Sequence, residues 1–386
     1  MTPTDPAHDV VVVGGGVIGL AVGWRAAAAG LKVAVVDPRP AGGATAVAAG
    51  MLAPVTEAAY GEQALLSLNL ASARRFPSFA AELAEAADRP AGYRETGTLA
   101  VAADADARAE LRDLHAFQTS LGLAAQWLTG RECRALEPML APGVTAGLHV
   151  AGDHQVDNRV LAAALLAAAD RTGVDLWRCR VREVLLAGDR VIGVRLDDDD
   201  VLSAGHVVLA AGCWSSRIGG LPPALLPPVR PVKGQILRLR VPAGNPRLLG
   251  RTVRGNTRGS HVYLVPRPDG EVVVGATTEE QGYDTRVTAG GVYDLLRDAH
   301  ELVPGVTELT LAEASAGLRP GTPDNAPILG PAPVPGLVYA TGHHRNGMLL
   351  TPVTADAVTA YLTGGALPEV AAPFTLDRFV REEVRT

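Results

Sequence analysis

The first forty residues carry an apolar pattern of strand, helix and strand. Residues 9–13 form a short apolar run that is typical of a buried strand. Residues 20–29 read as a helix that ends at Gly30, because glycine is common just after the last helical residue. A second apolar run, residues 32–36, ends at an acidic residue, Asp37. This order predicts a β-α-β unit at the start of the chain.

Helical and extended patterns alternate along the rest of the chain. Apolar residues recur at helical spacing in four further stretches: 62–89, 105–122, 159–172 and 290–302. Extended runs are predicted at 177–185, 190–196, 206–212, 260–266, 271–275, 312–319 and 336–340. The run 260–266 alternates, so His261, Tyr263 and Val265 are expected on one face of a strand. That face either lines a pocket or is half-buried in a sheet.

Three glycines stand in the turn between the first strand and the first helix. Gly14, Gly16 and Gly19 have the spacing G-x-G-x-x-G. In a nucleotide-binding turn the first glycine allows the tight bend, the second lets the backbone approach a pyrophosphate, and the third lets the helix pack on the strand. The pyrophosphate then lies at a helix N-terminus, where free N–H groups favour anions. Asp37 stands where a carboxylate accepts a ribose hydroxyl, which favours FAD or NAD over NADP.

Two loops extend this site along the chain. Residues 40–54 are uncharged and rich in alanine and glycine, which suits close backbone approach to an extended ligand as well as a flexible linker. Residues 341–347 form a glycine-bounded loop between a strand and a helix that is expected to run to about residue 362. This second strand-loop-helix passage again offers oriented N–H groups. With one dinucleotide bound, it is expected to face the redox ring.

Composition and charge narrow the class of protein. A chain of 386 residues that is 47% hydrophobic suits two domains, or one large α/β domain with insertions, and excludes disordered and disulfide-scaffold classes. Only Lys32 and Lys233 among its 35 basic residues are lysines, but the net charge is −6 and no basic run occurs, so no nucleic-acid partner is expected. Cys133, Cys179 and Cys213 lack paired spacing, which predicts free thiols in a reducing cytoplasm.

Other kinds of site are not expected. No apolar stretch reaches the roughly 18 residues that a membrane helix needs, and residues 1–9 lack the basic segment of a secretory signal. The acidic run 197–200 reads as a solvated loop, since adjacent carboxylates do not converge on one ion, and no metal site is expected. No Ser-His-Asp order suggests a hydrolase triad.

Together the motifs resemble the D-amino-acid-oxidase superfamily of FAD enzymes. The matching segments occur in the family's order over nearly the whole chain: 10–37, 50–52, 232–235, 275–277, 317–321 and 341–347. The resemblance implies an α/β plus α+β fold, in which a doubly wound, Rossmann-type FAD-binding domain is interleaved with an antiparallel-sheet substrate domain. The expected FAD domain comprises residues 1–57, 150–220 and 312–365, the substrate domain comprises 58–149 and 221–311, and a tail follows at 366–386.

The resemblance also assigns roles to matched positions. Arg319 matches the arginine that binds the substrate carboxylate, Arg345 a second contact, and Tyr263 a pocket tyrosine. His261, Met51 and Thr278 complete the expected substrate pocket. The expected FAD contacts are Gly14, Gly16, Val17, Ile18, Gly19, Asp37, Pro38, Thr45, Ala49, Gly50, Met51, Val181, Gly212, His343, His344, Arg345, Asn346, Gly347, Met348 and Leu349. Gly317 stands where sarcosine oxidases can carry a cysteine that binds flavin, so non-covalent FAD is implied.

The implied reaction is the oxidation of a small amine. Within the superfamily, the resemblance is to the branch that oxidises glycine, or amines such as sarcosine and D-alanine, to an imine, reduces O2 to H2O2 and supplies thiamine thiazole synthesis. The same resemblance implies a homotetramer. Three alternatives stay open: a D-amino-acid or sarcosine dehydrogenase that passes electrons to a carrier, an NAD-dependent dehydrogenase that shares the first motif, and a flavoprotein that holds FAD as a structural ligand.

Overall fold

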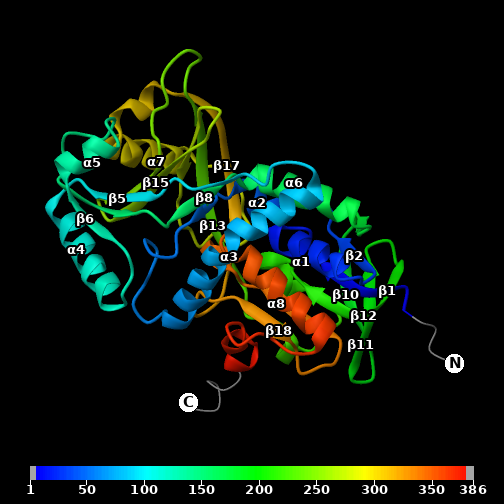
Figure 1. The fold of residues 1–386 in the computed structure, drawn as a ribbon. Coiled ribbons are helices and arrows are strands. Elements are labelled where there is room, and N and C mark those ends of the chain that lie inside the picture. The colour runs from blue at the N-terminus through cyan, green and yellow to red at the C-terminus, as the bar shows by residue number, and fades with distance from the viewer. Residues whose placement is uncertain (1–5, 380–386) are drawn as a thin grey trace.

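Three β-sheets organise the molecule. The structure is a computed structural model and describes residues 6–379. Two sheets have eight strands each and one has three. Figure 1 shows the two large sheets side by side, each with its own layer of helices. This arrangement confirms the mixed α/β and α+β class expected from the sequence, in which two sheet systems are interleaved along one chain.

The first large sheet is assembled from three distant segments of the chain. Its central part follows the order β12-β1-β2-β9, and β19 pairs with the other side of β12. All these pairs are parallel, and they are valine-rich because both faces are covered. The parallel strands are β1 (His8–Val13), β2 (Val33–Val36), β9 (Asp175–Trp177), β12 (Val201–Leu209) and β19 (Leu337–Thr341). The antiparallel strands are β10 (Val181–Ala187), β11 (Arg190–Leu196) and β18 (Ile328–Pro331).

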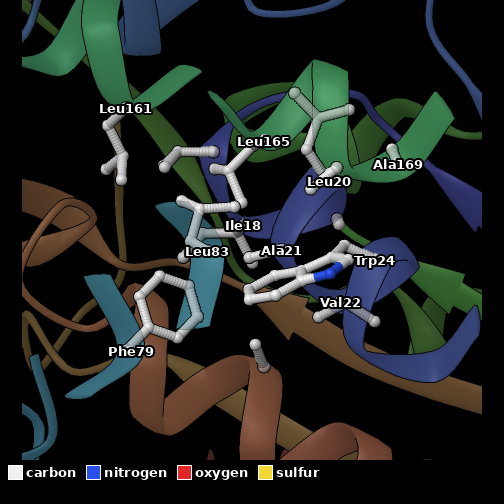
Figure 2. Packing of buried hydrophobic residues seen from close by; sticks show 14 of the residues in the cluster. Ile18, Leu20, Ala21, Val22, Trp24, Phe79, Leu83, Leu161, Leu165 and Ala169 are labelled. Atoms are coloured by element: carbon white, nitrogen blue, oxygen red, sulfur yellow. The ribbon is translucent and has the colours of Figure 1, made fainter. Parts of the chain in front are cut away.

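Four helices cover one face of this sheet. They are α1 (Val17–Ala28), α3 (Gln63–Ala87), α6 (Asn158–Arg171) and α8 (Thr351–Gly364). Figure 2 shows how Trp24 of α1 packs beside Phe79 of α3, with Leu165 of α6 close by. The ring centroids of Trp24 and Phe79 lie 5.4 Å apart in an edge-to-face arrangement. These contacts fix α1, whose N-terminus follows the glycine turn.

The second large sheet has the order β17-β13-β16-β15-β14-β5-β7-β6. Its neighbours are antiparallel except for the β14–β5 pair. The strands are β5 (Thr98–Ala102), β6 (Gln126–Thr129), β7 (Ala146–Val150), β13 (Arg230–Arg240), β14 (Thr252–Thr257), β15 (Ser260–Pro266), β16 (Glu271–Gly275) and β17 (Thr310–Gly321). Helix α7 (Ala289–Leu302) packs Leu295, Ala299 and Leu302 on one face. Helix α4 (Ala105–Ser120) and the short helix α5 (Gly130–Leu136) flank the far edge.

A small sheet joins the two halves. It contains β3 (Met51–Leu52), β8 (His154–Val156) and β4 (Tyr93–Arg94), with β8 in the middle. The β3 strand continues from α2 (Gly43–Val47), the short helix of the small-residue loop. This loop therefore lies at the boundary between the first and the second large sheet.

The structure differs from the sequence expectations in several boundaries. Segment 232–235, one of the segments that carry the family resemblance, lies inside β13, where its backbone pairs with residues 316–319 of β17. Strand β17 runs to Gly321 in the second sheet, so the return to the first sheet begins at β18 rather than at residue 312. The helix expected directly after residue 347 starts at Thr351, behind a 3-10 turn at His344–Asn346.

The division into an FAD domain and a substrate domain stays a proposal with these boundaries moved. Helix α3, expected in the substrate domain, packs against α6 and α8 beside the first sheet. The expected tail is also packed: Phe374 is buried, and Arg378 forms an ion pair with Asp324 at 2.7 Å. Residues 380–386 of that tail lie outside the described residues. None of the helices between residues 6 and 379 is long and apolar enough to cross a membrane.

Candidate active site

A cavity of about 1370 Å³ runs between the two large sheets. It begins at the glycine turn after β1, follows the small-residue loop and ends among side chains of β15 and β17. Pockets for drug-sized ligands usually measure about 300–1,000 Å³. The cavity therefore has room for a dinucleotide together with a small second molecule.

The glycine turn forms one end of this cavity. Gly14 has φ +108°, and a Cβ there would lie 2.4 Å from the carbonyl oxygen of Ala210. Gly16 lines the cavity, and the backbone N–H of Val17 donates to Oγ1 of Thr45 at 2.9 Å. Gly19 does not line the cavity: a Cβ there would lie 1.8 Å from the Gly14 carbonyl oxygen. Its role is helix packing, as the third glycine of such a turn requires.

Asp37 braces the glycine turn and also faces the cavity. One carboxylate oxygen accepts from the N–H of Gly15 at 2.7 Å, and the other accepts from the N–H of Arg39 at 2.7 Å. Pro38 and Val181 line the cavity beside it. Both carboxylate oxygens keep lone pairs free, so Asp37 can still accept a hydrogen bond from a hydroxyl group of a ligand.

The small-residue loop forms the middle of the cavity. Ala49, Gly50 and Met51 line it, and Gly50 adopts φ +76° with a virtual Cβ only 1.9 Å from the carbonyl oxygen of Val156. A side chain at Gly50 would push the loop away from β8. Gly212, which begins the turn after β12, lines the opposite wall with φ +56°.

Arg319 dominates the end of the cavity formed by the second sheet. Its Nη1 donates to the carbonyl oxygens of Thr277 (3.1 Å) and Lys233 (3.4 Å). In the part of the chain that the structure describes, no carboxylate pairs with it. A Cβ on Gly234 would lie 2.4 Å from Arg319 Nη2, so the glycine makes room for the guanidinium. Arg319 is therefore a cation held by carbonyl dipoles and free to bind an anion.

Other expected pocket residues gather around Arg319. Tyr263, His261, Thr278, His344 and Arg345 all line the same cavity. The alternation expected for residues 260–266 is observed, since Tyr263 faces the cavity and Val262 packs under α7. Arg345 is exposed, and no carboxylate among residues 6–379 forms an ion pair with it. Two cations without acidic partners thus border this end of the cavity.

Two further residues belong to this group and were missed by the sequence reasoning. Arg254 of β14 forms an ion pair with Glu57 at 3.1 Å, and both side chains line the cavity. Arg254 is the direct cross-strand partner of Tyr263. The signal was present in the sequence: Arg258 and Gly259 form a two-residue turn with positive φ, which fixes the hairpin register and places residue 254 opposite 263.

Burial and neighbouring charges shift the pKa values of the ionisable side chains at this end of the cavity. Burial raises the pKa of the Glu57 carboxyl, but Arg254, Arg345 and Arg319 together hold it below its usual value. Burial raises the pKa of Tyr263, although Arg319 opposes the effect, so the phenol stays protonated. Burial also lowers the pKa of His344 to about 4, with the help of Arg345 and Arg319. At neutral pH three guanidinium groups therefore face one carboxylate.

The 341–350 segment supplies the wall next to the glycine turn. His343, Gly347 and Met348 line the cavity. His343 is buried with Nε2 2.9 Å from Oγ1 of Thr354, and burial lowers its pKa to about 3, so the ring is neutral. Two expected flavin contacts are not on the wall: Asn346 does not line the cavity, and Leu349 is buried in the core beneath α1.

The other expected contacts are brought together in one place. Those that line the cavity are Gly14, Gly16, Val17, Ile18, Asp37, Pro38, Thr45, Ala49, Gly50, Met51, Val181, Gly212, His343, His344, Arg345, Gly347 and Met348. They form a continuous path from a phosphate-type turn to a pair of free cations. In residues 6–379 no three His, Cys, Asp or Glu side chains come together as a metal site would require.

Comparison with known proteins agrees with this geometry. The family model described as FAD dependent oxidoreductase (DAO) matches residues 9–361. The chain is 35% identical over 382 residues to the bifunctional protein ThiO/ThiG of Trichormus variabilis, covering 98% of this chain and 56% of that protein. The chain thus spans about half the length of this relative.

Glycine oxidase of Geobacillus kaustophilus matches along its whole length. It is 36% identical over 377 residues, which cover 97% of each chain. The crystal structure of glycine oxidase from Geobacillus kaustophilus superimposes with a TM-score of 0.87 at 34% identity, covering 96% of this chain and 98% of that one. A cavity that begins at a dinucleotide turn and a family match over nearly all residues lead to one conclusion: the chain belongs to the FAD-dependent oxidoreductase family DAO, and FAD is its cofactor.

Proposed function

We propose that this protein is an amine oxidase of the glycine oxidase type. It oxidises the amine of glycine, and of small amines such as sarcosine or D-alanine, to the imine and reduces O2 to H2O2. The observation that carries the proposal is Arg319, a guanidinium without an acidic partner at the end of the cavity that begins at the glycine turn. The glycine oxidase named above, which matches over both full lengths, supports it.

Residues along the cavity would hold FAD between the two sheets. The N–H groups behind Gly14 and Gly16 would receive the pyrophosphate, Asp37 the ribose, and residues 49–51 and 343–348 the flavin. When bound, FAD accepts the hydride that leaves the substrate Cα. The task of the chain is then to bind the substrate and to orient its Cα–H bond.

Arg319 and Tyr263 would orient the substrate through its carboxylate. The guanidinium fork can donate two parallel hydrogen bonds, which fixes the direction of the Cα–H bond as well as its position. The Tyr263 phenol, kept protonated by burial, can donate a third hydrogen bond. Arg345 lies at the exposed rim and would add attraction for the anion. Orientation of this kind lowers the barrier because the reactants no longer lose freedom in the reaction step.

Non-covalent attachment of FAD is part of the proposal. Gly317 lines the cavity and carries no thiol. Cys213 also lines the cavity, but burial raises its pKa to about 12, so the thiol stays protonated and is a poor nucleophile. Assembly as a homotetramer, a cytoplasmic location and delivery of the imine to thiamine thiazole synthesis remain predictions from the family resemblance.

A substrate panel tests the proposed reaction. Purified holoenzyme is mixed with glycine, sarcosine or D-alanine in air, and peroxide is measured with a coupled peroxidase. We expect peroxide from glycine, and the yields from sarcosine and D-alanine rank the three amines as substrates. A parallel assay without oxygen contains an artificial electron-accepting dye.

The two assays separate the alternatives. Rapid dye reduction with no peroxide in air would replace the oxidase with a dehydrogenase. Bound FAD that none of the amines reduces would indicate a structural flavin and overturn the proposal. Acid precipitation of the protein should release the flavin into the supernatant, whereas flavin that stays with the pellet would contradict non-covalent attachment.

A further inference from the structure

Two arginines are among the largest fully buried side chains of the molecule, and neither lines the cavity. Arg238 of β13 and Arg267, directly after β15, expose about 1% of their side chains. Their residues alternate with those that pack under α7, so both point from the second sheet toward the first. Buried guanidinium groups are costly unless their donors are used. Their partners therefore indicate what they are for.

Arg267 grips the small-residue loop directly. Its Nη2 donates to the carbonyl oxygen of Ala49 at 2.6 Å, and its Nη1 donates to Oε1 of Gln155 at 2.7 Å. Asp157 lies 3.8 Å from its Nε. Burial lowers the pKa of Arg267 to about 10, so the group remains charged at neutral pH. One planar fork thus ties the loop to β8 of the small sheet.

Arg238 acts on the same loop through Asn158. Its Nη1 pairs with Glu271, and its Nη2 donates to Oδ1 of Asn158 at 3.2 Å. That contact turns the amide so that Nδ2 donates to the carbonyl oxygens of Thr45 (2.8 Å) and Ala46 (3.1 Å). The same Thr45 accepts the N–H of Val17 in the glycine turn through its hydroxyl.

Few side chains of the loop itself can hold it, although Gly50 accepts a hydrogen bond from β8 and Val47 packs against Gly317. Residues 43–50 are Gly, Ala, Thr, Ala, Val, Ala, Ala and Gly, so few side chains can anchor the backbone by packing. Buried backbone carbonyls require donors, and three of those in this segment receive them from Arg267 or Asn158. The opposite side of the same loop, including Thr45 and Ala49, lines the cavity.

We propose that Arg267 and the Arg238–Asn158 pair are positioning residues that hold the loop 43–50 in its FAD-binding conformation from behind. The second sheet thereby shapes the cofactor site of the first. The affinity for FAD would then depend on residues that contact neither FAD nor the substrate. This inference rests on the family's cofactor and needs no assumption about glycine.

The test measures the grip on FAD without any substrate. Holoenzyme carrying Arg267→Met or Asn158→Ala is diluted, and released FAD is followed by its fluorescence. We expect the Kd for FAD to rise about 10- to 100-fold, because hydrogen bonds to or through a charged group are lost. We also expect the visible circular dichroism of bound flavin to change. The control is Arg240→Met on β13, the strand that carries Arg238. The side chain of Arg240 is half-exposed and pairs with Asp269, so the Kd of this variant for FAD should equal that of the parent.

A purely structural role gives a different result. If the arginines only stabilise the fold, the melting temperatures of FAD-free and FAD-bound protein fall equally and the stabilisation by FAD is unchanged. If they position the loop, the FAD-bound form loses more, because its gain from the ligand shrinks. Arg267→Lys keeps the buried charge and covers the case in which Arg267→Met does not fold. Parent-like Kd and parent-like stabilisation by FAD in the folded variants would overturn the proposal, whatever the substrate panel shows.

Discussion

At the residue scale, three arginines differ in what their donors meet. Arg238 and Arg267 have carboxylate or amide partners, whereas Arg319 has only carbonyl oxygens of the backbone. Carbonyl dipoles orient a guanidinium without neutralising it, so its positive charge remains available to a ligand. The difference in partners, rather than burial alone, separates a residue that binds from residues that hold the fold.

Exchange of Arg319 for lysine isolates the value of the fork. Arg319→Lys keeps the charge but loses the planar pair of donors, and we expect kcat/KM for glycine to fall by about 2–4 kcal/mol in transition-state stabilisation, mostly through a higher KM. Steady-state peroxide release measures both constants. Arg286→Lys, at an exposed arginine that pairs with Asp284, is the matched control. Glycine kinetics equal to those of the parent enzyme would refute the role of Arg319.

The residues that the sequence revealed are those in local motifs. Gly14, Gly16 and Asp37 could be recognised because their chemistry depends on spacing over a few residues. The position of Arg254 opposite Tyr263 follows from the Arg258-Gly259 turn and was missed, whereas its pairing with Glu57 could not be recognised, because the two segments lie almost two hundred residues apart in the chain. Arg238 and Arg267 escaped for the same reason, since nothing in an alternating strand shows which of its faces meets another sheet.

At the element scale, the β1-α1-β2 unit formed as its pattern predicted. The apolar runs and the glycine turn agree with the observed bounds to within a few residues, because local periodicity and turn chemistry fix such a unit. The start of α8 was misjudged. Residues 344–346 take a 3-10 turn, and His344 adopts φ +44°, a conformation that no propensity pattern of this segment indicates.

The packing of α1 on its turn depends on Gly19. A Cβ there would lie 1.8 Å from the carbonyl oxygen of Gly14, so Gly19→Ala must push α1 or the turn aside. We expect the variant to lose about 1–3 kcal/mol of folding free energy, as overpacked sites do, and to be purified with less bound FAD. Thermal unfolding and the visible absorbance of bound flavin measure the two effects.

The matched control lies at the end of another helix of the same layer. Gly364→Ala, in the last turn of α8, places its Cβ in open space, with no heavy atom within 4 Å. This variant should keep both its FAD content and its melting temperature. If Gly19→Ala behaves like Gly364→Ala, the close approach of α1 to the glycine turn is not required for FAD binding.

At the scale of the whole molecule, the chain passes several times from one large sheet to the other. The first sheet draws on residues 8–36, 175–209 and 328–341, and the second on the segments between them. The sequence showed this interleaving only through family resemblance, because the pairing of distant strands leaves no local pattern. The cavity forms where the segments cross, so groups buried there link the site to the stability of the entire fold.

Acid should lower the free energy of unfolding because two buried histidines, His343 and His344, resist protonation in the folded chain. Burial lowers the pKa of His343 to about 3 and that of His344 to about 4, whereas both titrate near 6.5 in an unfolded chain. Below pH 6.5 the unfolded chain therefore binds protons that the folded chain refuses, and each histidine reduces the free energy of unfolding by up to about 1.4 kcal/mol per pH unit. The full contribution of both histidines is present above pH 6.5.

One buried acid works in the opposite direction, and this difference in sign makes the prediction testable. Burial raises the pKa of Asp153 to about 6, so between about pH 4 and 6 the folded chain holds a proton that the unfolded chain releases. Urea unfolding between pH 4.5 and 6.5 should show His343→Gln with a shallower loss of stability toward acid than the parent. Asp153→Asn should show a steeper loss, because the opposing proton is gone. Equal slopes for parent and His343→Gln would mean that the buried ring accepts a proton in the folded protein, and the neutral wall of the cavity would then not exist.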